Sequence, residues 1–324
     1  MFFEKRVMFL VAETPVHAGS GNELGIVDLP IQRERYTDFP KIEGSSLKGS
    51  LREAFSCSEV EIDVGQKKFP VKSLVNEIFG PDGEEETYAG SFVITDARIL
   101  LFPVKSLKGV FAWITSPMVL KRFARDLSMA GLDNLLNEFG LLETENLANT
   151  VPGGSEVTLG QGGSSDVILE EFTFKVSENK NTNQLAKKLA EKIFPEDNAS
   201  LALWRDKLAK NLVVLADDHF KGFVKFHTEV ITRTKIDPQT GTVATGALWT
   251  EEYLPQDSVL YSILMFTQPR FMEKSKKLND FISEKNPVEL SKWVADVFLK
   301  GLPKVIQVGG NQTIGKGFVR TVVI

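Results

Sequence analysis

The chain has 324 residues, of which 42% are hydrophobic and 25% charged, and its formal net charge is -5. This length and balance fit one elaborated globular domain or two, and they exclude a disordered chain, a collagen and a coiled coil. The single cysteine excludes a disulfide framework and a cysteine-rich metal site, and the acidic total excludes a uniformly basic nucleic-acid binder, though not a local basic face.

The predicted elements alternate between strands and helices. Apolar runs rich in β-branched residues predict strands, and apolar residues at helical spacing predict helices. This interleaving is typical of an α+β or α/β domain. The expected strands are 6–14, 92–102, 110–115, 167–175, 212–216, 259–266, 305–308 and 319–324, and the expected helices are 45–56, 185–193, 201–212, 277–284 and 288–299.

The segment before the first helix is a glycine-rich loop followed by alternating charges. Asp28 stands between two apolar residues, where a carboxylate is unusual unless it caps a turn. Arg33 and Arg35 alternate with Glu34, so both arginines would point to one face of an extended segment.

The helix at 45–56 carries further candidate binding residues. Ser45 or Ser46 is a suitable N-cap, and the free N–H groups at a helix start favour phosphate. Lys48 and Arg52 lie at i and i+4 on one face. We predict phosphate contact here, with a plain solvated helix as the alternative.

Residues 225–250 predict a long hairpin, because β-rich runs flank the turn sequence DPQTG at 237–241.

The glycine-rich tail resembles a P-loop only superficially. Gly310 and Lys316 fit the spacing, but Gly317 replaces the expected Ser or Thr, and a strand follows instead of a helix. Its small residues would let the backbone approach a phosphate closely, and a tight turn is the alternative.

Other catalytic patterns are sparse. The three histidines show no zinc-ligand spacing. Residues 217–219 (DDH) follow an apolar strand and predict a strand-end turn. Glu251 and Glu252 are either catalytic carboxylates or the solvated base of the hairpin. No apolar run approaches the ~20 residues of a membrane span, and we expect a cytoplasmic protein.

Five segments together resemble one family. They resemble the RAMP superfamily of CRISPR-Cas proteins, with the greatest likeness to the family of fourth (backbone) subunits of type III-B (Cmr) effector complexes. The likeness is weakest over about 57–200. The segments are HAGSG at 17–21, GIVDLPIQRER at 25–35, PKIEGSSLKGSLR at 40–52, GALWTEEYLP at 246–255 and QVGGNQTIGKGF at 307–318.

The resemblance implies an α+β fold with a ferredoxin-like (RRM-like) core. It implies one elaborated domain over 1–324, helical insertions within about 57–200 and a β-hairpin thumb at about 226–253. Copies of the chain would stack into a helical filament on a guide (CRISPR) RNA, together with other Cmr subunits. The thumbs would interrupt the guide–target duplex, and the target RNA would be cut at regular intervals by a metal-dependent endoribonuclease reaction.

The resemblance assigns metal-dependent cleavage to Asp28, with Mg²⁺ or Mn²⁺ as the ion, and places His17 and Glu252 near the site. RNA supplies its own 2′-OH nucleophile, so the protein mainly needs to position groups and stabilise charge. One carboxylate that holds a divalent ion against phosphate oxygens would suffice. We expect RNA contacts from Arg33, Arg35, Ser45, Ser46, Lys48, Arg52, Gly310 and Lys316.

Two other functions stay open. The chain could be a non-catalytic RNA-binding scaffold of the same kind of complex, or a guide-RNA processing RAMP nuclease that uses His17 as a general base without metal. The charge distribution adds a hypothesis about assembly. Residues 98–125 hold only basic charges and residues 126–171 only acidic ones, and two such blocks are candidate faces between copies.

Overall fold

The computed structural model describes residues 2–21, 25–64, 67–82, 88–142, 146–160, 165–270, 278 and 285–324. Apart from Leu278, the helix predicted at 277–284 lies outside the described residues.

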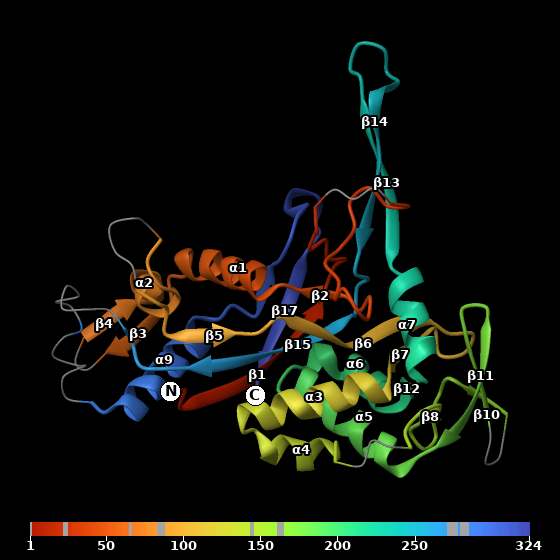
Figure 1. Ribbon diagram of the computed structural model, residues 1–324, viewed down its shortest axis with the longest axis horizontal. Helices are drawn as coiled ribbons and strands as arrows, with labels where there is room; N and C mark the ends of the chain where they lie inside the picture. The colour runs from red at the N-terminus through yellow and green to blue at the C-terminus, as the bar shows by residue number, and fades with distance from the viewer. Residues whose placement is uncertain are drawn as a thin grey trace.

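A sheet of 13 strands extends through the length of the molecule (Figure 1). Most of its pairs are antiparallel, and β11–β8 and β12–β7 are parallel, which makes the sheet mixed. The fold is therefore of the α+β class. In spatial order the main path is β16 (Val305–Gln307), β17 (Phe318–Val323), β1 (Glu4–Ala12), β15 (Val259–Phe266), β6 (Ala97–Lys105), β7 (Phe111–Thr115), β12 (Leu212–Val214), β8 (Thr150–Val151), β11 (Phe172–Glu178), β10 (Ser165–Leu169) and β9 (Thr158–Leu159), with β2 (Lys41–Ile42) beside β6 and β5 (Phe92–Ile94) beside β15.

The four strands β17, β1, β15 and β6 form the centre of this sheet and are antiparallel to their neighbours. Helix α1 (Gly44–Ser56) lies between β1 and β6 in the chain, and α9 (Pro287–Gly301) lies between β15 and β17. Strand β1 is buried on both faces, which explains its continuous apolar run Val7–Ala12.

Aromatic residues fill both faces of the central sheet. On one face Phe298 of α9 packs against Phe55 of α1 and Phe266 of β15, with ring centroids 5.2 and 5.4 Å apart. On the opposite face Phe123 packs 6.2 Å from Phe9 and 4.5 Å from Tyr261. Tyr261 and Phe266 are five residues apart on one strand, so alternation sends them to opposite faces.

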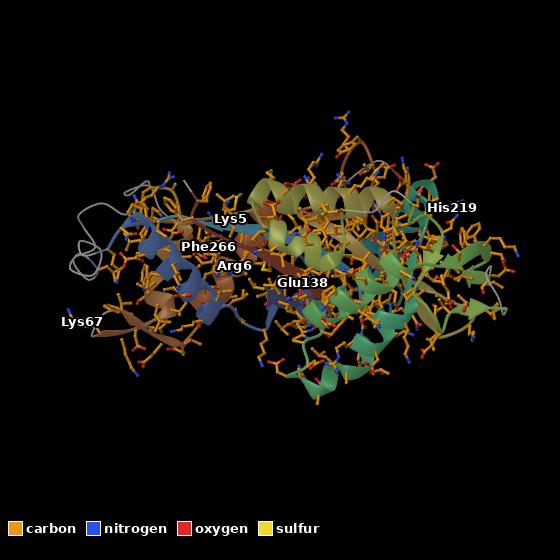
Figure 2. All side chains as sticks on the ribbon, turned by 90° about the horizontal axis from the view of Figure 1, so that it is seen from below. Lys5, Arg6, Lys67, Glu138, His219 and Phe266 are labelled. Atoms are coloured by element: carbon orange, nitrogen blue, oxygen red, sulfur yellow. The ribbon has the colours of Figure 1, made fainter. Side chains whose placement is uncertain are left out.

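The remaining helices cover the second face and the far part of the sheet, except α2, which lies beside α1 with Phe79 packed 5.1 Å from Phe55 (Figure 1). Seen from below, the small β3–β4 hairpin with Lys67 lies at one end of the molecule, and α7 with His219 lies toward the other (Figure 2). These elements are α2 (Val75–Phe79), α3 (Pro117–Ala130), α4 (Asp133–Phe139), α5 (Lys180–Ile193), α6 (Ala202–Asn211), α7 (Asp217–Phe226), β3 (Glu61–Val64), β4 (Lys67–Pro70) and the 3-10 turns Val71–Leu74, Ala199–Leu201 and Gln312–Ile314.

The predicted hairpin is confirmed. Strands β13 (Glu229–Ile236) and β14 (Val243–Tyr253) pair antiparallel, with Thr232 opposite Thr250, and project from the body (Figure 1). The turn between them has the expected chemistry, since Asp237 Oδ1 accepts from the backbone N–H of Gln239 at 2.8 Å.

Four local predictions are wrong. The single strand predicted at 92–102 is divided into β5 and β6, which pair separately with β15. Helix α1 begins at Gly44, so neither Ser45 nor Ser46 is the N-cap; Asp96 Oδ1 instead accepts from the Gly44 N–H at 2.9 Å. The strand predicted at 167–175 is a hairpin of β10 and β11, with a turn at Glu170, whose φ is 50°. Residues 217–219 begin α7 instead of ending a strand, because acidic residues favour the first turn of a helix.

Within the described ranges, no helix combines the length and the apolar character that crossing a membrane requires.

Candidate functional site

The candidate site is built along one edge of β14, at the foot of the hairpin. Residues two apart in a strand point their backbone groups to the same side, so Thr250 and Glu252 both face away from β13. The loop of residues 28–31 fills this edge. The Leu29 N–H donates to the Thr250 carbonyl at 3.0 Å, and the Glu252 N–H donates to the Leu29 carbonyl at 3.0 Å.

Asp28 is exposed and is tied to this edge by one of its two carboxylate oxygens. Its Oδ2 accepts from the backbone N–H of Thr250 at 2.8 Å and from the Thr250 hydroxyl at 2.9 Å. These bonds, the backbone one first, hold the pKa of Asp28 below its usual value. The lowered pKa keeps this carboxylate ionised at neutral pH. Its other oxygen, Oδ1, accepts no hydrogen bond from another described residue and is open to solvent.

His17 is fixed two residues farther along the same edge. Its Nδ1 lies 2.7 Å from the Glu252 carbonyl oxygen. A carbonyl can only accept, so Nδ1 carries the hydrogen, and a neutral imidazole then leaves Nε2 as an acceptor. A Cβ on Gly19 would lie only 2.9 Å from His17 Nε2, so glycine at this position keeps that nitrogen accessible.

Glu252 is only 5% exposed and holds several segments together. Its carboxylate accepts from the Ile31 N–H at 3.0 Å, from the Thr228 hydroxyl at 2.6 Å and from the guanidinium of Arg33, with which it forms an ion pair. Arg33 also donates to the Val224 carbonyl of α7 at 2.9 Å. Glu252 therefore anchors the loop, the hairpin and α7 to one another.

A second carboxylate cluster lies on the other side of β14. Glu251 is 6% exposed and accepts from Trp249 Nε1 and Asn311 Nδ2, both at 2.9 Å, and from Arg233 Nε at 3.2 Å. The Tyr253 hydroxyl also donates to Glu251. Burial alone would raise the pKa of Glu251, but the donors outweigh it and lower the pKa.

The glycine-rich tail packs directly on the His17 segment. A Cβ on Gly309, whose φ is 81°, would lie 2.2 Å from the His17 carbonyl oxygen. The Gly310 N–H donates to the same oxygen at 2.9 Å. Lys316 Nζ lies 5.0 Å from the centroid of the Tyr253 ring. The tail thus holds His17 in place, and no helix follows it, unlike in a P-loop.

The candidate residues of α1 form a separate group. Gln32 connects the group to the loop, since its Nε2 donates to the Ser46 hydroxyl at 3.3 Å and its Oε1 accepts from the Glu43 N–H at 2.7 Å. Burial, and then the charge of Arg52, lower the pKa of Lys48. Arg52 donates to the Gly80 carbonyl at 2.6 Å and to Asn76 Oδ1 at 2.9 Å.

The structure thus brings together His17, Asp28, Arg33, Glu252, Gly310 and Lys316, whereas Ser45, Ser46, Lys48 and Arg52 lie along α1. Arg33 points to Glu252, whereas Arg35 lies exposed in a turn. We predicted that one extended segment would contain both arginines, but that segment ends before Arg35. Sequence reasoning missed Thr250, Tyr253 and Asn311. Period-two alternation in β14 would have placed Tyr253 beside Glu251.

The donor set fits a sparsely held divalent ion. Within the described part of the chain, no group of three or more His, Cys, Asp and Glu side chains is arranged as a metal cage. Mg²⁺ commonly keeps several waters and binds one or two carboxylates plus substrate phosphates. Asp28, with an open Oδ1 on an exposed carboxylate, matches this type of ligand.

Comparisons with known proteins agree with this architecture. The family model described as the RAMP superfamily matches residues 9–320. The Pyrococcus furiosus protein named CRISPR system Cmr endoribonuclease Cmr4 is 40% identical over 309 residues, which cover 95% of this chain and 91% of that protein.

Solved structures extend the likeness. The crystal structure of oligomeric Cmr4 from Pyrococcus furiosus matches with a TM-score of 0.63 and 31% identity, covering 98% of this chain and 97% of that one. A chain in the cryo-EM structure of the type III-B Cmr-beta complex bound to cognate target RNA matches with a TM-score of 0.69 and 21% identity, covering 99% and 98%, a likeness that shows the fold alone. The chain therefore belongs to the RAMP superfamily and, within it, to the Cmr4 family.

Proposed function

We propose that this chain is the backbone subunit of a type III-B CRISPR effector complex, which binds guide RNA and cuts complementary target RNA at regular intervals. One observation carries the proposal: Asp28 and His17 converge on Thr250 and Glu252 at the foot of a projecting hairpin. The family supports it, since the 40% identical relative is named an endoribonuclease.

Each residue has a role in this reaction. Asp28 Oδ1 would hold Mg²⁺ or Mn²⁺, and the ion would neutralise charge on the phosphate. His17 Nε2 would accept the proton of the 2′-OH as its oxygen bonds to the adjacent phosphorus. The P–O5′ bond would break, and the 5′ oxygen would leave as a hydroxyl with a proton from water. Glu252 would keep Arg33, the loop and β14 in register. The catalytic set is thus Asp28, His17 and Glu252, with Glu252 acting through its neighbours.

The fold provides the frame for this function. The antiparallel order β17–β1–β15–β6, together with α1 and α9, supports a ferredoxin-like core within one domain over residues 1–324. The projecting β13–β14 pair supports a thumb, and the helices within 57–200 support insertions. RNA would meet this frame through Arg33, Arg35, Ser45, Ser46, Lys48, Arg52, Gly310 and Lys316.

Other chains complete the complex. We propose that copies of this chain stack along the guide RNA and contact other Cmr subunits. Self-association is supported by the crystal structure of the relative, which is described as oligomeric. Sequence specificity would come from base pairing with the guide, so the protein would need only backbone contacts.

The test uses the assembled complex and a 5′-labelled complementary RNA, with Mg²⁺ or Mn²⁺. We expect a ladder of evenly spaced products that EDTA abolishes. Asp28→Asn should slow cutting about 100-fold or more and leave RNA binding intact, because it keeps an oxygen for Thr250 but removes the charge. Asp218→Asn, an exposed carboxylate on α7, is the matched control and should cut normally. Unchanged cutting by Asp28→Asn would refute the role of Asp28.

One observation favours a non-catalytic scaffold. Asp28 Oδ2 accepts two bonds from Thr250, which gives the carboxylate a structural role of its own. If the wild-type complex binds the target RNA but does not cut it with Mg²⁺ or with Mn²⁺, the chain is a scaffold. Asp28 then serves only to hold the loop on Thr250.

A further inference from the structure

A basic pocket of about 340 Å³ lies beside the turn that follows Arg33. It lies along the N-terminal half of α3, beside the first residue of α7. Its basic residues belong to the block 98–125, and none of the residues expected to contact RNA lines it. The lining residues are Pro117, Met118, Lys121, Arg122, Arg125 and Asp217.

Positive charge in this pocket exceeds negative charge. Lys121 is exposed and has no acidic partner among the described residues. The Arg125 side chain is 67% exposed, and its one carboxylate neighbour, Asp126, lies 3.8 Å away. Asp126 is itself occupied by Arg98 at 2.7 Å.

The one acidic lining residue has a partner of its own. Asp217 Oδ1 accepts from the Met118 N–H at 2.8 Å, and this one carboxylate stands against three basic side chains in the lining. Lys121 and Arg125 stand one helical turn apart on α3, so both cations lie on one face of that helix. Their chemistry calls for an anion with spaced charges.

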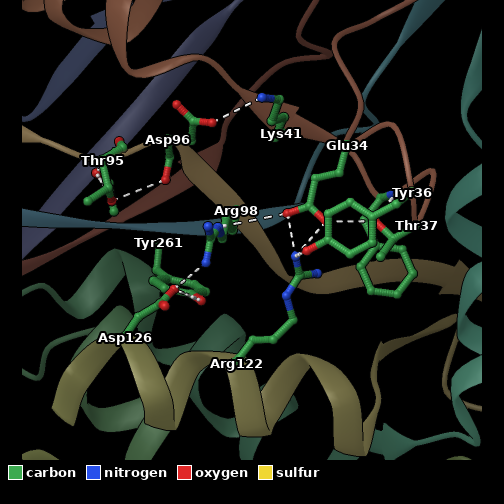
Figure 3. A network of polar contacts seen from close by, with 12 residues as sticks. Glu34, Tyr36, Thr37, Lys41, Thr95, Asp96, Arg98, Arg122, Asp126 and Tyr261 are labelled. Carbon is green, nitrogen blue, oxygen red and sulfur yellow. Dashed lines mark hydrogen bonds and ion pairs between the residues drawn. The ribbon is translucent and has the colours of Figure 1, made fainter. Parts of the chain in front are cut away.

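An exposed tyrosine contacts the pocket lining through Arg122 (Figure 3). Tyr36 is 76% exposed. Its hydroxyl accepts from Arg122 at 2.7 Å, and the Arg122 guanidinium also donates to both carboxylate oxygens of Glu34, at 2.7 and 2.6 Å. The Arg122 guanidinium also lies 5.7 Å from the centroid of the Tyr36 ring, so this residue connects the exposed ring to the pocket lining.

The segment that carries Tyr36 also carries residues of the candidate site. Tyr36 follows Arg33 by three residues, and Arg33 is paired with Glu252. Tyr36 is eight positions after Asp28, so their Cα atoms lie at most roughly 29 Å apart. A strand of RNA held at Asp28 therefore has this surface within reach.

We propose that Lys121, Arg125 and Tyr36 form a second RNA contact, which holds a single-stranded stretch of the RNA that enters or leaves the candidate site. Lys121 and Arg125 bind successive phosphates, and one base stacks on Tyr36. Cations on phosphates and aromatic rings under bases are the two elements of sequence-tolerant single-strand binding. This inference rests on the proposed function.

The test measures binding of a labelled single-stranded RNA to the full chain over a range of salt concentrations. The double variant Lys121→Gln/Arg125→Gln should lower the slope of log affinity against log salt by about 1.4, because each lost phosphate contact removes about 0.7. Tyr36→Ala should weaken binding roughly 5- to 100-fold, and Tyr36→Phe, which keeps the ring, should bind like the wild type.

The control is Lys180→Gln/Lys187→Gln, which removes two exposed lysines from α5 and should leave the slope unchanged. Equal slopes for both double variants would overturn the inference. So would normal RNA affinity combined with lost assembly, which would make the pocket a contact for an acidic protein surface. The proposed function would fail in a different way, through a wild-type chain that binds no RNA or a wild-type complex that cuts none.

Discussion

At the scale of single residues, the ion pair between Arg33 and Glu252 holds the loop of residues 28–35 in place. Glu252 is buried, and Arg33 is the cation that balances it, with a side chain only 18% exposed. Removing one member of such a pair leaves an unpaired buried charge, which costs more than the net contribution of the pair.

We predict that Arg33→Ala destabilises the chain by about 2–4 kcal/mol. This is slightly below the usual range for an orphaned buried charge, because Ile31 and Thr228 would still donate to Glu252. Urea unfolding measures the change. Arg35→Ala, two residues away and exposed, should change stability by less than about 0.5 kcal/mol. Equal losses in the two variants would show that the pair does not anchor the loop.

Some residues of the candidate site could be identified from the sequence, and others could not. Asp28, His17 and Glu252 stand in family motifs, and the resemblance singled them out. The cluster around Glu251 depends on partners from distant segments, with Asn311 60 residues away in the chain. Local patterns carry no information on such pairs. The structure also shows what the motif cannot, that Glu252 is buried among donors.

At the scale of elements, the tail glycines allow two segments to approach more closely than side chains permit. Gly309 and Gly315 both have positive φ, 81° and 77°. A Cβ on Gly309 would collide with the His17 carbonyl, whereas a Cβ on Gly315 would meet nothing within 4 Å. An alanine at Gly315 would therefore test backbone strain alone, whereas an alanine at Gly309 would add the close contact.

We predict that Gly309→Ala costs about 2–5 kcal/mol, the sum of left-handed strain and overpacking, and that it reduces cutting by displacing His17. Gly315→Ala should cost only the strain, about 1–2 kcal/mol, and should cut normally. Thermal unfolding and the cleavage assay measure the two effects. A similar loss in both variants would mean that the close contact with His17 has no role of its own.

A strand with a continuous apolar run could be predicted from the sequence, whereas other elements were missed or joined together. Strand β15 was predicted with its correct bounds, because a continuous apolar run is typical of a strand buried on both faces. Helix α3 was missed, although Ser116 caps it and Pro117 occupies its first turn. The turn between β10 and β11 places Glu170 in the left-handed region, and no glycine or asparagine at this position indicates such a turn in the sequence.

At the scale of the whole molecule, the two charge blocks do not form two uniform faces. Basic Arg98 and acidic Asp126 come from opposite blocks and pair with each other. Glu138 and Glu156 of the acidic block pair with Lys192 and Lys210. The charges that stay available for contacts between copies are therefore fewer than the sequence indicated, and Lys121 and Arg125 are among them.

Asp257 couples the stability of the whole chain to pH. It lies beside Trp204, whose Nε1 donates to Asp257 Oδ1 at 3.0 Å, and its burial raises the pKa of this carboxyl above the ordinary value of 3.8. A carboxyl with a raised pKa binds protons more tightly in the folded state. Its contribution to stability therefore falls as the pH rises from about 3.8 through the folded pKa.

We predict that Asp257→Asn raises the free energy of unfolding at pH 7 by about 0.5–1 kcal/mol, in the range of other stabilising substitutions. Asparagine keeps an oxygen for Trp204, removes the buried charge and tolerates the left-handed backbone at this position, where φ is 66°. Urea unfolding at pH 7 and at pH values below 3.8 measures the gain, which should vanish in acid because the wild-type carboxyl is then neutral in both states. Asp206→Asn removes the same charge from an exposed position on α6 and should give no such pH-dependent gain. A gain that persists in acid would assign the effect to packing instead of charge.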